Sequence, residues 1–188
     1  MLDYKGSRIE DYPEIGHKWP DETNHESLLN ALRVLDTGSL SEIEEVFDAE
    51  SVLTYMAGNV VLGSWDIYSS TGHNYYLYEA TPGRFVMLPW DMNGSLEAGV
   101  IELCSIMGGL LTRKLMESPE NQARYFELLE EFLTTSGSEE RVRVRLEAAE
   151  NLLGSEISQE EIGMLLHENE SRVEQLEEQL RSTAPTCK

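Results

Sequence analysis

GSWDIYSSTGHNYYLYEATPGRFVMLPWDMN, residues 63–93, is the stretch that decides how this chain folds. Residues 69–72 are small and polar and are typical of a turn. Residues 75–78 are aromatic or branched and apolar, residues 81–83 supply turn chemistry, and residues 84–88 have the character of a buried return strand. The stretch therefore predicts a β-hairpin that follows a polar loop.

Two acidic residues and one amide frame this hairpin. Asp66 and Asn74 precede the first strand, and Asp91 follows the second. In protein kinases a catalytic-loop aspartate orients the nucleophile, while an asparagine of the same loop and an aspartate beyond the next hairpin hold Mg²⁺. Carboxylate and amide oxygens are ligands that suit Mg²⁺ or Mn²⁺. The order and types of these residues predict a metal-dependent phosphoryl-transfer site.

Each residue also has a simpler interpretation when it is taken alone. Asp66 could be a solvated loop residue, Asn74 could cap a strand, and Asp91 could form an Asx-turn with Asn93. The glycine and aromatic residues around all three favour the shared site. We expect the aromatic residues themselves, Trp65, Trp90 and residues 75–78, to belong to the core rather than to a platform that stacks on a nucleotide.

His73 lies between the turn and Asn74. We expect it to orient the loop through a backbone hydrogen bond, and proton transfer is the less favoured role.

The motif carries a family resemblance. Residues 53–93, LTYMAGNVVLGSWDIYSSTGHNYYLYEATPGRFVMLPWDMN, resemble the core of the CotH family of spore-coat protein H kinases, which has a similar G-H-N-Y-Y-L-Y and a closing P-W-D. A weaker likeness continues through residues 110–133 and 171–180, which resemble the helical tail of the same domain.

The resemblance implies a function and a set of roles. It implies an atypical protein kinase that moves the γ-phosphate of ATP to Ser or Thr of a protein substrate, such as a basic, Ser-rich spore-coat protein. Asp66 would be the catalytic aspartate, and Asn74 and Asp91 would bind Mg²⁺ or Mn²⁺, with His73 and Asn93 as supporting residues. It also implies a location in the spore coat or outside the cell.

The chain departs from common kinase patterns, and in one position from the family pattern, in several ways. Eight positions separate Asp66 from Asn74, where the usual catalytic loop has five, and no D-F-G is present. Asn93 stands where the family usually has a second acidic residue. The sequence also contains no G-x-G-x-x-G and no valine-rich strand that bears a lysine, the two parts that grip ATP phosphates in a kinase N-lobe.

The expected fold is therefore mainly α with a small β-hairpin, a protein-kinase-like C-lobe without its N-lobe. A shortened gene, a start assigned too late, an isolated domain or a genuine short paralogue would all give such a sequence. We expect an irregular lead-in over residues 1–25 and the C-lobe over residues 26–183. Within the lobe, residues 52–95 are the motif core and residues 118–183 are the helical tail, and residues 184–188 form a disordered tail.

Helical periodicity and capping residues predict most other elements. Residues 26–35 and 41–47 form two short helices, and a largely buried helix begins after Asp48 and ends at Gly63. Ser118-Pro119 and Ser138 begin two further helices, the second with Val142, Leu146, Ala149 and Leu153 facing inward. Ser158 and Glu161 form a capping box for a last helix with Ile162, Leu166, Asn169, Val173, Leu176 and Leu180 on its inner face. Beyond it the last seven residues should fray.

The net charge of the chain favours some classes of binding partner over others. The formal net charge is −21 for 188 residues. Such a surface repels nucleic-acid phosphates and anionic lipids and favours basic proteins, although acidic surfaces also serve solubility alone.

The cysteines, the histidines and the N-terminus add little. Cys104 and Cys187 suggest no disulfide framework, and the four histidines have no paired metal-binding spacing. No apolar run is long enough for a signal peptide or membrane insertion, so the sequence leaves the compartment open.

Two classes of function remain at this stage. The first is a protein kinase that uses Asp66, Asn74 and Asp91 with ATP and Mg²⁺ or Mn²⁺. The second is a catalytically silent, acidic module that keeps these residues and binds a basic protein partner.

Overall fold

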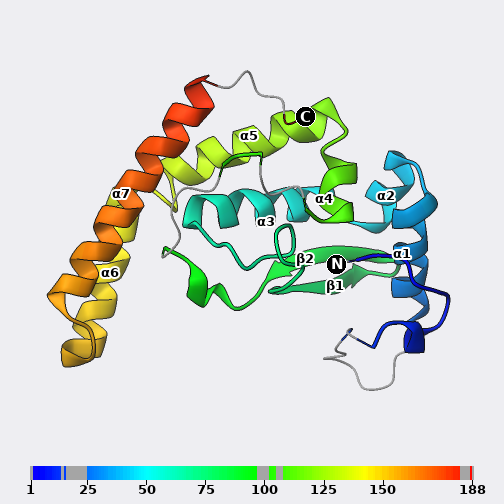
Figure 1. Ribbon diagram of the computed structural model, residues 1–188, viewed down its shortest axis with the longest axis horizontal. Helices are drawn as coiled ribbons and strands as arrows, with labels where there is room; N and C mark the ends of the chain where they lie inside the picture. Colours follow the sequence, from blue (N-terminus) through cyan, green and yellow to red (C-terminus); the bar gives the residue numbers. More distant parts are fainter. Residues whose placement is uncertain are drawn as a thin grey trace.

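The structure is a computed structural model that describes residues 2–13, 15, 25–96, 102–104, 108–182 and 187. Over these residues it is mainly helical with an antiparallel hairpin, which confirms the expected mainly α fold with a small β-hairpin (Figure 1). The helices and strands are α1 Glu26–Thr37, α2 Leu40–Val46, α3 Ala49–Leu62, β1 Tyr75–Thr81, β2 Arg84–Pro89, α4 Leu110–Leu115, α5 Pro119–Thr134, α6 Glu139–Leu153 and α7 Gln159–Ser182, with short 3-10 turns at Ile9–Asp11, Met92–Gly94 and Gly154–Glu156.

Helix α3 lies at the centre of the molecule and contacts α5, β2, α4 and α7 (Figure 1). Most of its side chains are buried, as the apolar sequence predicts. The Asp48 carboxylate accepts the Ser51 N–H at 2.9 Å and caps its start. Gly63 adopts the left-handed conformation, φ 65°, and ends the helix directly before the loop that carries Asp66.

Capping residues fix the starts of α2, α5, α6 and α7. Ser39 and Glu42 form a capping box for α2, and Ser118, followed by Pro119, caps α5. Ser138 caps α6, and the Glu161 carboxylate accepts the Ser158 N–H at 2.8 Å in the predicted box of α7.

The hairpin pairs β1 with β2 in a register that sets Leu77 opposite Met87. One face of β2 is buried through Phe85 and Met87, whereas Leu88 on the other face is exposed. The expectation of a wholly buried return strand is therefore wrong. The sheet has two strands and packs one face on α3, so alternate side chains face away from the core.

Helices α6 and α7 pack side by side and extend beyond the central helices (Figure 1). Ile162, Asn169 and Leu176 of α7 are buried, as the periodicity predicts. In α6 Val142 is buried, but Leu153 at the far end is exposed, so its predicted inward position is wrong. Leu153 is the last residue of α6, directly before the 3-10 turn Gly154–Glu156, where α6 and α7 extend beyond the central helices (Figure 1).

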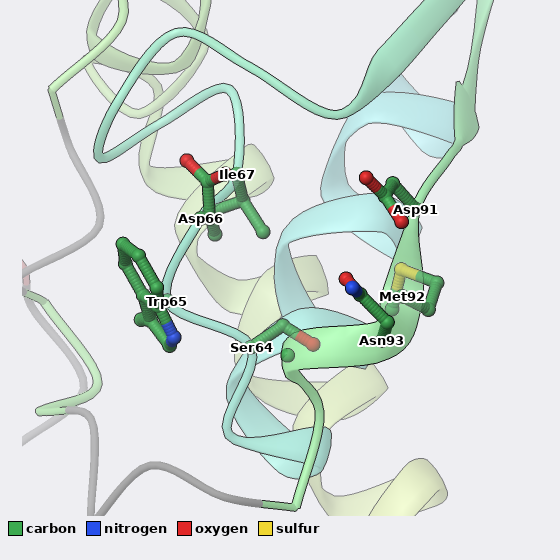
Figure 2. Close-up of a pocket in the computed structure, with 8 residues that line it drawn as sticks. Ser64, Trp65, Asp66, Ile67, Asp91, Met92 and Asn93 are labelled. Carbon is green, nitrogen blue, oxygen red and sulfur yellow. The ribbon is translucent and has the colours of Figure 1, made fainter.

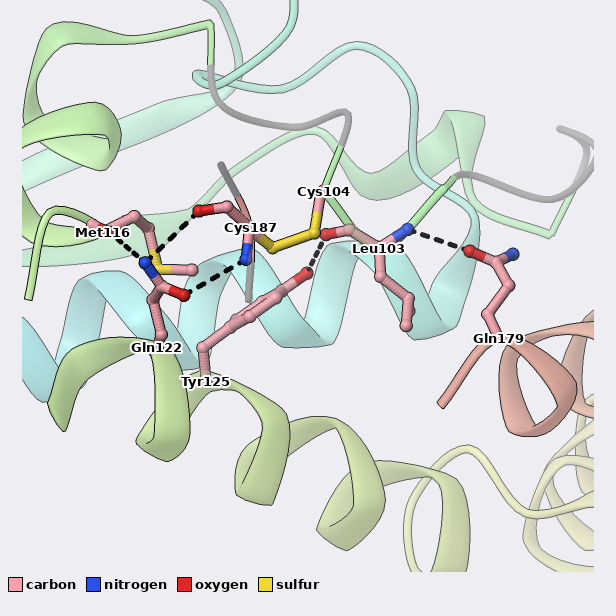
Figure 3. The surroundings of a disulfide bond; sticks show 7 residues. All are labelled: Leu103, Cys104, Met116, Gln122, Tyr125, Gln179 and Cys187. Atoms are coloured by element: carbon pink, nitrogen blue, oxygen red, sulfur yellow. Dashed lines mark hydrogen bonds between the residues drawn. A yellow bond between two sulfur atoms is a disulfide. The ribbon is translucent and has the colours of Figure 1, made fainter. Parts of the chain in front are cut away.

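A disulfide joins Cys104 to Cys187, and the expectation that these cysteines form no such link is wrong. The two cysteines are 83 residues apart in sequence, and their Cα atoms are 5.3 Å apart. Gln122 of α5 strengthens the junction, because its side chain exchanges two hydrogen bonds with the Cys187 backbone, at 3.1 and 3.2 Å (Figure 3).

The two ends of the chain are only partly described. In the lead-in, Leu2 and Tyr12 are buried against the core. Near the C-terminus α7 runs to Ser182 and Cys187 is held by the disulfide, so the expected fraying does not apply to these two residues. Residues 183–186 and 188, which make up most of the expected disordered tail, lie outside the described residues. Of the helices over the described ranges, none combines the length and apolar character needed to cross a bilayer.

Candidate functional site

The loop between α3 and β1 is a compact turn built on one carbonyl. The Ile67 carbonyl accepts the N–H groups of Ser70, Thr71 and Gly72 at 3.1, 2.9 and 3.2 Å. The hydroxyl of Ser70 also donates to the carbonyl of Trp65. Small, polar residues allow this tight winding, which carries the chain from Asp66 back toward Asn74.

Asp66 is held by three residues of its own loop. The Thr71 hydroxyl donates to Oδ1 at 2.5 Å, and His73 Nδ1 lies 3.3 Å from the same oxygen. Asn74 Nδ2 donates to Oδ2 at 3.0 Å. The Thr71 hydrogen bond lowers the pKa of the Asp66 carboxyl most, and the nearby His73 and Asn74 lower this pKa further, against a smaller opposing effect of burial. Asp66 is thus ready to accept a hydrogen bond from a hydroxyl as a carboxylate.

Asn74 is bound to Asp66 rather than standing apart from it. Its side-chain nitrogen also donates to the Asp66 backbone carbonyl at 2.8 Å. The residue adopts the left-handed conformation, φ 56°, which asparagine tolerates better than most residues. With the nitrogen end of the amide used by Asp66, the oxygen end is the part that could serve a cation.

Asp91 follows β2 and is also left-handed, with φ 48°. It precedes the 3-10 turn Met92–Gly94, and its side chain makes no capping hydrogen bond to that turn, which argues against the simple Asx-turn interpretation. The segment after it is tied to the end of α3, because Leu96 N–H donates to the Leu62 carbonyl at 2.8 Å and the Ser64 and Ser95 hydroxyl oxygens lie 2.6 Å apart.

The start of the α3–β1 loop, residues 64–67, and the segment 91–94 after β2 form the walls of a pocket of about 300 Å³ (Figure 2). Trp65 and Asp66 lie on one wall, and Asp91, Met92 and Asn93 lie on the opposite wall. The structure therefore brings Asp66, Asp91 and Asn93 to one pocket. Asn74 and His73 are not among the residues that line it, and both reach it through their contacts with Asp66.

The donor set fits a hard, hydrated cation only in part. Asp91, Asn93 and the Asn74 oxygen are hard donors of the kind that Mg²⁺ and Mn²⁺ prefer. Among the described residues no three His, Cys, Asp or Glu side chains lie close enough to hold a metal by themselves. A cation here would therefore depend on water and on substrate phosphate oxygens for most of its ligands.

The aromatic residues around the pocket correct one expectation. Trp65 and Trp90 are each 55% exposed and Tyr78 is 59% exposed, so they do not belong to the core. Trp90 packs on Tyr76, with ring centroids 4.9 Å apart, and the indole of Trp65 lies over Gly94. Sequence reasoning assigned them to the core because large aromatic residues in an apolar context usually lie there.

Sequence reasoning missed Thr71 and Tyr55 as parts of the site. The sequence predicts Thr71 as a turn residue, and in the structure its hydroxyl, five positions after Asp66, folds back on that carboxylate. The hydroxyl of Tyr55 in α3 accepts the Tyr68 N–H at 3.0 Å and donates to the Asn74 carbonyl at 3.2 Å. No sequence pattern indicates the role of Tyr55, because its hydrogen-bond partners, Tyr68 and Asn74, are 13 and 19 residues away along the chain. His73 also differs from expectation, since its side chain faces the Asp66 carboxylate.

Comparison with known proteins assigns the family. No curated protein matches the chain. The family model described as CotH kinase protein matches residues 3–184, nearly the whole chain, and the protein therefore belongs to the CotH kinase family.

Proposed function

We propose that this protein carries the hydroxyl-activating and metal-holding part of a phosphotransferase that acts on Ser or Thr of a protein. Membership of a kinase family supports the reaction class. The observation that carries the assignment of residues is the pocket with Asp66 on one wall and Asp91 and Asn93 on the other (Figure 2).

In the proposed reaction the substrate hydroxyl lies against the Asp66 carboxylate. The hydroxyl oxygen bonds to the γ-phosphorus of ATP, the bond from that phosphorus to the β–γ bridging oxygen breaks, and ADP leaves. The hydroxyl proton passes to Asp66. Thr71 and Asn74 hold the two carboxylate oxygens, so that Asp66 faces the substrate in one orientation.

Asp91 and Asn93, on the wall opposite Asp66, would hold Mg²⁺ or Mn²⁺, and the Asn74 side-chain oxygen, on the Asp66 side, would be a further ligand. When bound, the ion would supply positive charge that stabilises the negative charge of the transferring phosphate. Because these residues offer few charged ligands, binding of the ion should be weak until ATP supplies phosphate oxygens.

A basic protein is the substrate that the acidic charge of the chain favours, and Ser is an acceptor that the kinase family suggests. The net charge of −21 attracts basic chains over a distance set by the ionic strength of the solution. The family resemblance to spore-coat kinases favours the same substrate class and a location in the spore coat or outside the cell.

A silent module is the second candidate function, and one observation favours it. The 188 residues contain no G-x-G-x-x-G, the loop that covers ATP phosphates in kinases. Such a chain would bind a basic partner through its acidic surface and transfer no phosphate.

Metal binding and label transfer together test the proposal. Titration calorimetry with Mn²⁺ and ATP should show binding to the wild type, most of which is lost in Asp91→Asn. The control Asp36→Asn changes an exposed carboxylate of α1 and should bind as the wild type does. Unchanged Mn²⁺ affinity in Asp91→Asn would exclude Asp91 as a main ligand.

Transfer of radiolabel from ATP to a basic, Ser-rich protein tests the chemistry. The chain alone should give no detectable transfer, because positioning of the phosphates carries much of this reaction. Joining the glycine-rich lobe of another family member ahead of Leu2 should restore transfer, and Asp66→Asn should lower the restored rate about 100-fold or more. Restored transfer that survives both Asp66→Asn and Asp91→Asn would place the chemistry elsewhere. If the joined protein binds a basic protein but transfers nothing, the silent module is correct.

A further inference from the structure

Tyr55 is a buried residue of α3 whose hydroxyl meets both ends of the loop that carries Asp66. The residue is 4% exposed. The hydroxyl accepts the Tyr68 N–H at 3.0 Å, just after Asp66, and donates to the Asn74 carbonyl at 3.2 Å, just before β1. Burial raises the pKa of this phenol to about 12, so the group is a neutral hydroxyl and keeps the proton that it donates.

The Asn74 carbonyl accepts a second hydrogen bond, and this one reaches the other wall of the pocket. Its donor is the N–H of Trp90, at 3.2 Å, and Trp90 directly precedes Asp91. One carbonyl oxygen thus joins the loop of Asp66, the end of β2 and the central helix. Displacement of Asn74 would move Asp66 and Asp91 relative to one another.

The hydrogen bonds within the loop do not fix the position of Asp66 relative to Asp91. The contacts of Asp66 with Thr71, His73 and Asn74, and the turn built on Ile67, tie the loop to itself. The loop is tied to other elements by Tyr68, whose hydroxyl accepts the Leu111 N–H at 3.1 Å, and by Ser69, whose carbonyl accepts the Gly108 N–H at 2.7 Å. Both of these lead toward α4. The Ser64 and Ser95 hydroxyl oxygens, 2.6 Å apart, tie the start of the loop to the segment after Asp91, and the Asn74 end of the loop is tied by Tyr55 and Trp90.

We propose that Tyr55 is the positioning residue that sets the Asp66 loop at its working distance from Asp91. This inference rests on the proposed function, because it assigns a role in that site. Tyr55 touches neither substrate nor metal. Its hydroxyl acts through the Tyr68 amide and the Asn74 carbonyl, and it is held by the most central helix of the fold.

Tyr55→Phe tests the role, with Tyr125→Phe as a matched control. Both changes keep the ring and remove one buried hydroxyl. Tyr125 lies in α5, and its hydroxyl donates to the Leu103 carbonyl at 2.8 Å, away from the pocket (Figure 3). Tyr55→Phe removes two hydrogen bonds and Tyr125→Phe removes one, so exchange of an amide away from the pocket is measured in both variants to compare their general loss of stability.

Amide hydrogen exchange gives a readout that needs no activity. In Tyr55→Phe the Tyr68 amide loses its acceptor. The Trp90 amide keeps its acceptor, the Asn74 carbonyl, but Tyr55 no longer holds that carbonyl in place. Both amides should exchange about tenfold faster than in Tyr125→Phe, while the Leu129 amide in α5 should exchange alike in the two variants. Trp90 exchange that is equal in the two variants would overturn the inference, because Trp90 does not bond to Tyr55 itself.

The same variants separate this inference from the proposed function. With the glycine-rich lobe joined, Tyr55→Phe should lower kcat at least about tenfold more than Tyr125→Phe and leave the KM for ATP similar. Equal kcat in the two variants would also overturn the positioning role. Failure of the wild type to bind Mn²⁺ or transfer phosphate would refute the proposed function, whereas the Trp90 exchange rate would still decide whether Tyr55 fixes the two walls.

Discussion

Thr71 is the residue on which the electrostatics of Asp66 depend most. Its hydroxyl lies 2.5 Å from Asp66 Oδ1 and 3.1 Å from the Ile67 carbonyl, so one proton has two acceptors within reach. A hydroxyl that donates to a carboxylate stabilises the charged form more than the neutral form. The pKa of Asp66 therefore lies below its ordinary value, chiefly because of Thr71.

Thr71→Val should reduce stability in a way that depends on pH. The stability that comes from the lowered pKa of Asp66 is present above the unfolded value, about 3.9, and is lost as pH falls through the lower folded value. The difference in melting temperature between the wild type and Thr71→Val should therefore be larger at pH 6 than at pH 3. Thermal unfolding across this range measures it.

Thr37→Val is the control for this experiment. The Thr37 hydroxyl donates to the Arg33 carbonyl at 3.0 Å, with no carboxylate involved. Its difference from the wild type should stay constant between pH 6 and pH 3. A constant difference for Thr71→Val as well would show that the hydroxyl does not stabilise the Asp66 carboxylate.

The sequence predicts which residue types form the site, but it does not predict which groups hydrogen-bond to them. An acid, an amide and a second acid around a hairpin are visible in the sequence, and the structure sets Asp66 and Asp91 on facing walls. Which group holds each carboxylate depends on turn geometry, and the winding around the Ile67 carbonyl has no periodic signature. The roles of Thr71 and Tyr55 follow from that geometry.

At the scale of elements, the end of α3 is fixed by a helix far along the chain. Gly63 has a left-handed φ of 65°, and a Cβ there would lie 2.4 Å from Nε of Arg172 in α7. Arg172 is buried, so its guanidinium has little room to move. The loop of Asp66 thus starts from a point where α3 meets α7.

Gly63→Ala should destabilise the protein more than Gly83→Ala. Gly83, in the hairpin turn, has φ 78° with no atom within 4 Å of an added Cβ, so alanine there meets backbone strain alone. That strain should cost about 1–2 kcal/mol. Gly63→Ala adds a steric overlap and should exceed it by about 1–3 kcal/mol. Urea unfolding of both variants measures the difference, and equal losses would mean that Arg172 withdraws from Gly63 at little cost.

Elements were predictable where local chemistry specifies them. Ser118-Pro119, Ser138 and the Ser158–Glu161 box mark helix starts because capping needs only neighbouring residues. Burial of the hairpin was predicted less well. The two-stranded sheet packs on α3, which covers only one of its faces. The sequence of a strand does not show whether one or both faces of its sheet are covered.

At the scale of the whole molecule, the disulfide joins segments that no local pattern relates. Cys104 precedes α4, and Cys187 follows α7. Around it, the Tyr125 hydroxyl donates to the Leu103 carbonyl, and the Leu103 N–H donates to Gln179 at 3.2 Å (Figure 3). Two cysteines 83 residues apart carry no framework signal, so only the packing of α5 and α7 reveals their pairing.

Replacing both cysteines by serine should lower the free energy of unfolding substantially. The disulfide closes a loop with a sequence separation of 83 residues, and the chain-entropy relation gives about 4.5 kcal/mol for a loop of that length. The remaining bonds of Gln122 to the Cys187 backbone are too few to hold the C-terminus in place once the chain is unlinked. Urea unfolding measures the free energy of unfolding of the wild type and of the double variant Cys104→Ser, Cys187→Ser. The two values should be equal when a reductant is present, and the value of the wild type should be higher when no reductant is present. The double variant itself should not respond to reductant. Disulfides persist chiefly in oxidising compartments, so the protein for this experiment should be purified from an oxidising compartment. If the cysteines of the unreduced, denatured wild type react with an alkylating agent, the disulfide does not form.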